Sequence, residues 1–179
     1  MRSAKLFLLV LAAVIGLMTM PAEARTRHRA NRASQPGADK TFVMKAAEGG
    51  MAEVQMAQLA QSKASNQAVK DMANRLYNDH NKANDNLKPI ASKDNTTWPA
   101  AMDAKSQREY NKLQALSGAD FDREYVNYQI KDHKDDITMF QHEVDHGTNA
   151  DVKAWASENL PTLREHLSMA ENALKQISK

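Results

Sequence analysis

The segment QAVKDMANRLYNDHNKANDNLKPI, residues 67–90, decides the fold. Its apolar residues recur three and four positions apart, which is the period of an amphipathic α-helix and not the alternation of a strand. Met72, Leu76 and Leu87 follow this stripe, and one polar residue, His80, lies on it too. We therefore predict a helix over residues 67–91 that buries a histidine near its midpoint.

Three further segments repeat this helical period: residues 40–64, residues 121–146 and the segment that follows Asn149. Between the second and third long helices, residues 92–100 read as a loop and residues 103–116 as a shorter helix. Glycine is scarce, and no window alternates as a strand would. The sequence predicts an all-α fold: a ferritin-like four-helix bundle with one long crossover that contains an extra short helix.

Local signals set the predicted helix boundaries. Gly147 closes the helix that ends at His146, and Pro161 predicts a bend in the last helix. The glycine pair Gly49–Gly50 predicts a close approach by another helix or by the crossover, because glycine in a helix interior otherwise costs stability. The predicted N-caps are Asp39, Ser65 or Asn66, Asp103, Asp120 and Asn149.

Each predicted long helix carries one polar residue near its midpoint on the inward stripe. Two interpretations compete. The residues could bind one transition metal ion, since imidazole and carboxylate suit Zn, Mn, Fe, Cu or Ni. Alternatively they form a hydrogen-bonded polar layer that fixes the register of the helices, and the sequence favours this view because buried histidines more often serve the core. The four residues are Glu53, His80, His133 and His166.

The usual di-iron site is absent from the pattern. That site needs Glu-x-x-His on two helices, but Tyr77, Ile130 and Leu163 stand three residues before the layer histidines. Glu143 and His146 have this spacing only at a helix end. No nucleophile elbow, phosphate loop or dinucleotide fingerprint is present either. The sequence therefore predicts no enzyme class, and a single metal held mainly by histidines remains the metal hypothesis.

Methionine and histidine one turn apart offer a weaker copper hypothesis. Met139 precedes His142 by three residues, and His166 precedes Met169 by three. Most methionines are expected to fill gaps between helices, so these pairs carry little weight. His142 and His146 lie in the last turn of their helix, where a cation is favoured by the helix dipole.

Residues 1–24 have the layout of a secretory signal. A short basic start precedes the apolar run LFLLVLAAVIGLMTM (6–20), and small residues follow at AEA (22–24). This predicts cleavage after Ala24 and a periplasmic or secreted protein. The segment RTRHRANR (25–32) carries four arginines, which oppose translocation, so an uncleaved anchor stays open.

The predicted linker, residues 25–38, is basic, whereas the rest of the mature chain is mildly acidic. This charge pattern argues against nucleic-acid binding. The arginines of residues 25–32 could contact anionic membrane or polysaccharide. The absence of cysteine excludes disulfides, thiolate metal sites and lipid attachment at cysteine.

Taken in order, several motifs resemble the DUF4142 family. They are the Ala-x-Gly-Gly region with Glu53, Asp79–His80, Gln129 with His133, and Leu-Pro-x-Leu-x-x-His-Leu at 160–167. The resemblance implies an exported bacterial protein with a ferritin-like bundle over residues 39–179 and no settled biochemical function. Many members of that family carry a lipid-attachment cysteine, which this chain lacks.

Two functions follow from these observations as hypotheses. The first is an exported helical-bundle protein with a binding or protective role in envelope or stress physiology. The alternative is a metal-binding or redox bundle with a Glu/His site in its core.

Overall fold

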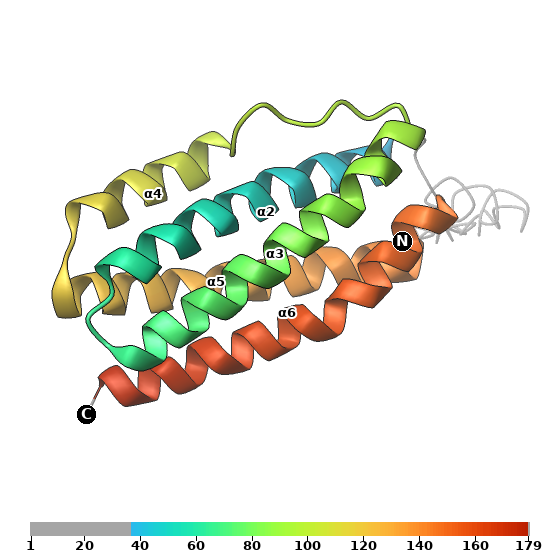
Figure 1. The fold of residues 1–179 in the computed structure, drawn as a ribbon. Helices are drawn as coiled ribbons and strands as arrows, with labels where there is room; N and C mark the ends of the chain where they lie inside the picture. Colours follow the sequence, from blue (N-terminus) through green and yellow to red (C-terminus); the bar gives the residue numbers. More distant parts are fainter. Residues whose placement is uncertain (1–36, 179) are drawn as a thin grey trace, which may run out of the picture. The chain divides into compact units, whose positions relative to one another are not determined.

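The computed structural model describes residues 37–178, and these fold into five α-helices (Figure 1). The predicted signal peptide and the arginine-rich residues 25–32 lie outside the described part of the chain. The all-α prediction is confirmed, and residues 37–178 contain no strand. The helices are α2 (Ala38–Lys63), α3 (Gln67–Lys93), α4 (Ala104–Ala115), α5 (Gly118–His146) and α6 (Ala150–Ile177).

The four long helices form two hairpins, α2–α3 and α5–α6, that lie side by side (Figure 1). Helix α3 packs along α6, and α2 packs along α5, so that the two hairpins close around a common interior. The connection between α3 and α5 contains α4, which packs against α2 and α5. The predicted short helix in a long crossover is therefore present.

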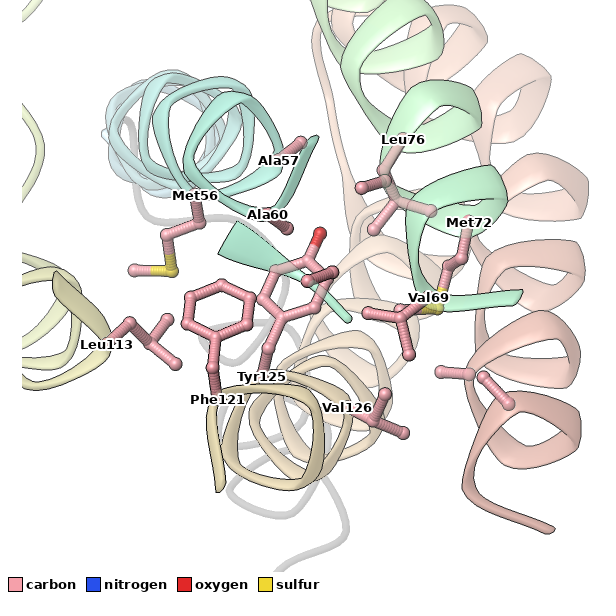
Figure 2. Packing of buried hydrophobic residues seen from close by; sticks show 14 of the residues in the cluster. Met56, Ala57, Ala60, Val69, Met72, Leu76, Leu113, Phe121, Tyr125 and Val126 are labelled. Carbon is pink, nitrogen blue, oxygen red and sulfur yellow. The ribbon is translucent and has the colours of Figure 1, made fainter. Parts of the chain in front are cut away.

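The apolar core is divided into two clusters. One surrounds Met72, Leu76, Phe121 and Tyr125, near the α2–α3 turn, and the other surrounds Phe42, Leu87, Phe140 and Trp155, near the α5–α6 turn. Figure 2 shows the first cluster, in which Phe121 and Tyr125 lie next to each other and extend from α5 toward α2. His80, Asn84, Gln129, His133 and His166 are buried and lie between the segments of α3, α5 and α6 that form the two clusters, and Glu53 of α2 lies at their boundary. A polar layer therefore crosses the middle of the bundle.

The inward stripes agree with the sequence pattern at most positions. On α5 the structure buries Gln129 completely, whereas the neighbouring Ile130 is only partly buried. On α3, Ala83 and Ile90 are only partly buried, and the neighbouring Asn84 is buried in their place. This difference arises because an amide can occupy an inner position where a glycine faces it.

That glycine is Gly50. A Cβ atom placed on it would lie 2.1 Å from Oδ1 of Asn84, whereas a Cβ on Gly49 would meet nothing within 4 Å. The predicted close approach is therefore confirmed at one of the two glycines only, and a side chain rather than a backbone makes it.

Three of the predicted N-caps are confirmed. The side chains of Asn66, Asp103 and Asn149 accept hydrogen bonds from backbone N–H groups in the first turns of α3, α4 and α6. The predictions for Asp39 and Asp120 are wrong, because the helices begin earlier and both residues lie in the first turn. Helix α6 continues through Pro161 to Ile177.

Two aspartates near helix starts accept hydrogen bonds from the turn of the hairpin to which they do not belong. Asp39, at the start of α2, accepts hydrogen bonds from the backbone N–H groups of Thr148 and Asn149 in the α5–α6 turn. Asp122, at the start of α5, accepts hydrogen bonds from the backbone N–H groups of Ser65 and Asn66 in the α2–α3 turn. These charge-assisted bonds join the hairpins at both ends of the bundle.

Candidate metal centre

Three histidines converge in the polar layer. His80 of α3, His133 of α5 and His166 of α6 are 7%, 0% and 1% exposed. One ring nitrogen from each lies within 4.8 Å of the other two, and within residues 37–178 they are the one group of three or more His, Asp or Glu residues with this spacing. The three helices therefore bring together ligands that are 33 to 86 positions apart in the sequence.

The spacing of the rings suits a single ion. Imidazoles that bind one ion at about 2.0–2.1 Å and at a tetrahedral angle hold their ring centres about 5.2 Å apart. The ring centres of His133 and His166 are 5.3 Å apart, as are those of His80 and His166, and those of His80 and His133 are 5.7 Å apart. Small side-chain shifts would thus complete the geometry.

The backbone of α5 fixes the tautomer of His133. Its Nδ1 lies 3.0 Å from the carbonyl oxygen of Gln129, one turn earlier. A carbonyl can only accept a hydrogen bond, so Nδ1 carries the proton and the Nε2 of the neutral ring carries a lone pair.

A carboxylate fixes the tautomer of His166. Its Nε2 lies 2.9 Å from Oδ2 of Asp79, which also accepts a hydrogen bond from Arg75 at 2.5 Å. Burial alone would raise the pKa of Asp79, but these two hydrogen bonds hold it below its ordinary value. Asp79 is therefore ionised and can only accept, so the proton of His166 stays on Nε2 and its Nδ1 carries a lone pair.

These two constraints direct two lone pairs at each other. Nε2 of His133 and Nδ1 of His166 are 3.2 Å apart. Nε2 of His80 is buried and has no hydrogen-bond partner among the described residues. Lone pairs at this separation repel unless a cation, either a proton or a metal ion, lies between them.

A proton is disfavoured at neutral pH. Burial lowers the pKa of His133 to about 3, with a further contribution from the neighbouring His166. Burial also lowers the pKa values of His80 and His166, although Asp79 opposes the shift at His166. All three rings are therefore expected to be neutral at pH 7, which is the form that binds metals.

Glu53, the fourth residue of the predicted site, does not belong to the histidine group. Its Oε2 accepts a hydrogen bond from the side-chain amide of Gln129 at 2.8 Å. Burial, the charge of Asp132 and the charge of Asp136 raise its pKa well above the ordinary value. Glu53 extends from α2, faces Gln129 and Asp132 of α5, and lies outside the group of converging ligand atoms.

A small cavity adjoins the cluster. Its volume is about 30 Å³, and His80 and His166 form part of its wall. Carboxyl, amide and indole groups from α3, α5 and α6 also reach it, including Asp79, Asp136 and Trp155. The indole N–H of Trp155 is buried without a hydrogen-bond partner among the described residues.

The methionines of the copper hypothesis pack against the core. Met169 contacts the cluster near the α2–α3 turn, and Met139 contacts the cluster near the α5–α6 turn. His142 belongs to no group of three or more His, Asp or Glu ligands in the described chain, whereas His166 belongs to the group with His80 and His133.

The segment HEVDH, residues 142–146, matches the H-E-x-x-H pattern of zinc hydrolases. His142 and His146 are exposed, with ring centres 4.7 Å apart, but no third ligand joins them within residues 37–178. Glu143 is buried against Gly147 and Asp39 rather than facing the exposed pair. The structure therefore does not assemble a hydrolase site from this motif.

The sequence alone did not predict that the side chain of Asp79 and the backbone carbonyl of Gln129 orient the histidine rings. Asp79 immediately precedes His80, and a neighbour in a helix points about 100° away, which turns Asp79 toward α6. The adjacent residues Asp79 and His80 could have drawn attention to this site. The role of Asp79, however, depends on the position of α6, which the sequence does not give.

None of the helices within residues 37–178 combines the length and apolarity that a membrane span requires. The family model described as "Domain of unknown function (DUF4142)" matches residues 23–173. The chain belongs to this family, as the sequence motifs predicted. No curated protein matches the sequence.

Solved structures share the fold at low sequence identity. A DUF305 fragment from Deinococcus radiodurans has a TM-score of 0.69 and 14% identity, over 80% of this chain and 99% of that one. A presumed secreted DUF305 protein from Streptomyces coelicolor has a TM-score of 0.68 and 13% identity, over 79% and 92%. The conserved hypothetical protein rv2844 from Mycobacterium tuberculosis has a TM-score of 0.62 and 19% identity, over 79% and 94%.

Proposed function

We propose that this protein is an exported helical-bundle protein that binds one transition metal ion through His80, His133 and His166. The observation that carries the proposal is the pair of facing lone pairs on His133 and His166, 3.2 Å apart, in a buried site. Hydrogen bonds to Gln129 and Asp79 impose this arrangement. In known metal sites, carbonyl and carboxylate partners orient histidine ligands in the same manner.

A purely structural polar layer explains these contacts less well. In a layer that only fixes register, each buried ring nitrogen should find a donor or acceptor, because an unpaired buried polar group costs stability. Here His80 leaves Nε2 unpartnered, and His133 and His166 present like groups to each other. A shared proton on His166 is the remaining structural explanation, and it opposes the lowered pKa of that ring.

The chemistry of the site favours borderline metals. Three neutral imidazoles suit Zn²⁺, Cu²⁺, Co²⁺ or Ni²⁺ better than Mg²⁺ or Ca²⁺, which prefer oxygen ligands. The binding role that the sequence predicts for the exported bundle would then be metal binding, or protection of the cell envelope by holding such an ion.

Metal titration tests the proposal. The purified protein, stripped of metal, is titrated with Zn²⁺ against a chromophoric chelator, and His80→Leu and the His142→Ala/His146→Ala double variant are measured in parallel. We expect one tight equivalent in the parent and in the double variant, and none in His80→Leu. Circular dichroism checks that each variant is folded. Tight binding that survives in His80→Leu but disappears with the exposed pair would refute the proposal.

Three finer assignments also stay proposals. The order of the helices and the long crossover support a ferritin-like bundle. The signal layout of residues 1–24 supports export, in agreement with the presumed secretion of the Streptomyces coelicolor protein. The four arginines of residues 25–32 support a salt-sensitive contact with anionic lipid, which should be lost when that segment is deleted.

A further inference from the structure

We infer that the ion held by the three histidines keeps one coordination position for a small anion, which occupies the adjacent cavity beside Asp79, Asp136 and Trp155. The inference rests on the proposed metal binding and adds the class of ligand that the ion would take. It follows from the number of protein ligands, the cavity and the charge of its surroundings.

The protein supplies three ligands and no fourth. Ions of this class usually take four ligands, and a site with three protein ligands leaves a position open to solvent or substrate. Two acids of the polar layer are already engaged: Asp79 accepts hydrogen bonds from His166 and Arg75, and Glu53 accepts one from Gln129. The group of potential ligands in the described chain accordingly stops at three histidines.

The cavity lies where the open position is needed. His80 and His166 belong both to the ligand group and to the cavity wall, so an ion between them adjoins this space. The cavity volume is about 30 Å³. One water needs about 10–15 Å³ by this kind of measure, so the cavity accommodates roughly two waters or a ligand of two to three non-hydrogen atoms.

The charge of the surroundings favours an anion. Three neutral imidazoles leave the charge of a divalent ion uncompensated in a buried site, which is costly. Asp79 supplies one negative charge through His166, but Arg75 offsets it. A small anion on the fourth position would neutralise part of this positive charge.

The cavity wall also suits an anion. Trp155 is 5% exposed and contributes an indole N–H that has no partner among the described residues. In the metal-free site, burial and the charges of Asp132 and Asp135 raise the pKa of Asp136 to about 8. The wall therefore includes a residue with an unpartnered hydrogen-bond donor.

Azide binding to the Co²⁺-loaded protein tests the inference, because the visible spectrum of Co²⁺ reports its ligands directly. We expect a saturable, one-to-one spectral change. Ala83→Leu narrows the cavity, since Ala83 lines it and is partly exposed, and should weaken azide binding about tenfold or more. Trp155→Phe removes the indole donor and should weaken azide binding about tenfold. Ala68→Leu, on the same helix but away from the cavity, should have no effect.

The outcomes separate the two proposals. Co²⁺ that binds in one equivalent but gives no spectral change with azide would overturn the open position and leave metal binding intact. Azide binding that Ala83→Leu and Trp155→Phe both leave unchanged would overturn the placement in this cavity. A protein that binds no Co²⁺ at all would refute the proposed function itself.

Discussion

Asp79 accepts a hydrogen bond from Nε2 of His166 at 2.9 Å, and this contact sets the direction of the other nitrogen of the ring. Because the proton is held on Nε2, the lone pair of Nδ1 is directed at His133. The pair Asp79–His166 joins α3 to α6 across the bundle. A carboxylate outside the ligand group thus organises the ligands within it.

Replacement of Asp79 should therefore weaken metal binding without removing a ligand. Asp79→Asn can donate as well as accept, so it no longer fixes the tautomer of His166. We expect the affinity for Zn²⁺ to fall about 10- to 100-fold, the usual effect of losing such a supporting group. Competition with a chelator measures the change, and Asp85→Asn on the exposed face of α3 is the control. An unchanged affinity would contradict the assigned role.

Replacement of His80 should stabilise the metal-free protein. The buried Nε2 of His80 has no partner among the described residues, and such a group costs about 1–3 kcal/mol. His80→Leu removes this cost, so its free energy of unfolding should rise by about 1 kcal/mol or more in denaturant titrations. The stabilisation that Zn²⁺ gives the parent should be lost. A strongly destabilised metal-free variant would instead show that His80 serves the core.

The pH dependence of binding should be shallow. Three histidines with the ordinary pKa of about 6.5 would lose about 50-fold in apparent affinity between pH 7.5 and pH 6, because protons compete with the metal. Here burial lowers the pKa of His133 to about 3 and also lowers those of His80 and His166. We expect a loss of less than about threefold over this range. A fifty-fold loss in the same titration would show ordinary, solvated imidazoles.

Glu143 should make stability depend on pH at the far end of the bundle. Burial and the charge of Asp39 raise the pKa of Glu143 from 4.5 to about 7. The folded state then binds the proton more tightly than the unfolded state, so this contribution to stability is complete below pH 4.5 and is lost as pH rises through 7. Glu143→Gln keeps the shape and removes the charge.

The melting temperature of Glu143→Gln should therefore exceed that of the parent at pH 8, with a smaller difference at pH 5. Glu158→Gln, at an exposed position on α6, serves as the control and should show no such trend. A difference that is equal at both pH values would argue that Glu143 is charged throughout.

The two adjacent glycines should respond in opposite ways to alanine. Gly49→Ala meets nothing within 4 Å and should stabilise the protein by about 1 kcal/mol through helix propensity. Gly50→Ala should instead destabilise by about 1 kcal/mol or more, because its Cβ would displace the buried amide of Asn84. Denaturant titrations measure both. The double variant Gly50→Ala/Asn84→Ala should recover the loss, and additive effects would rule out this contact.

Much of the fold could be read from the sequence because it depends on local periodicity. The stripe through Met72, Leu76 and Leu87 predicted α3, and the same period located the other long helices. The N-caps Asn66, Asp103 and Asn149 could also be predicted, because each bonds to residues only two or three positions further along the chain. Asp39 was misread because its partners Thr148 and Asn149 lie more than 100 positions away, where no local pattern points.

The sequence by itself determined most of the residues that face inward, including His80, His133 and His166, because helical period sets the buried face of a helix. Only the tertiary structure decided how those residues meet. The packing of α3 against α6 directs Asp79 to His166, and the position of α2 directs Glu53 to Gln129 and away from the histidines. Side-chain direction across helices depends on their relative rotation and height, and a one-dimensional pattern does not contain either quantity.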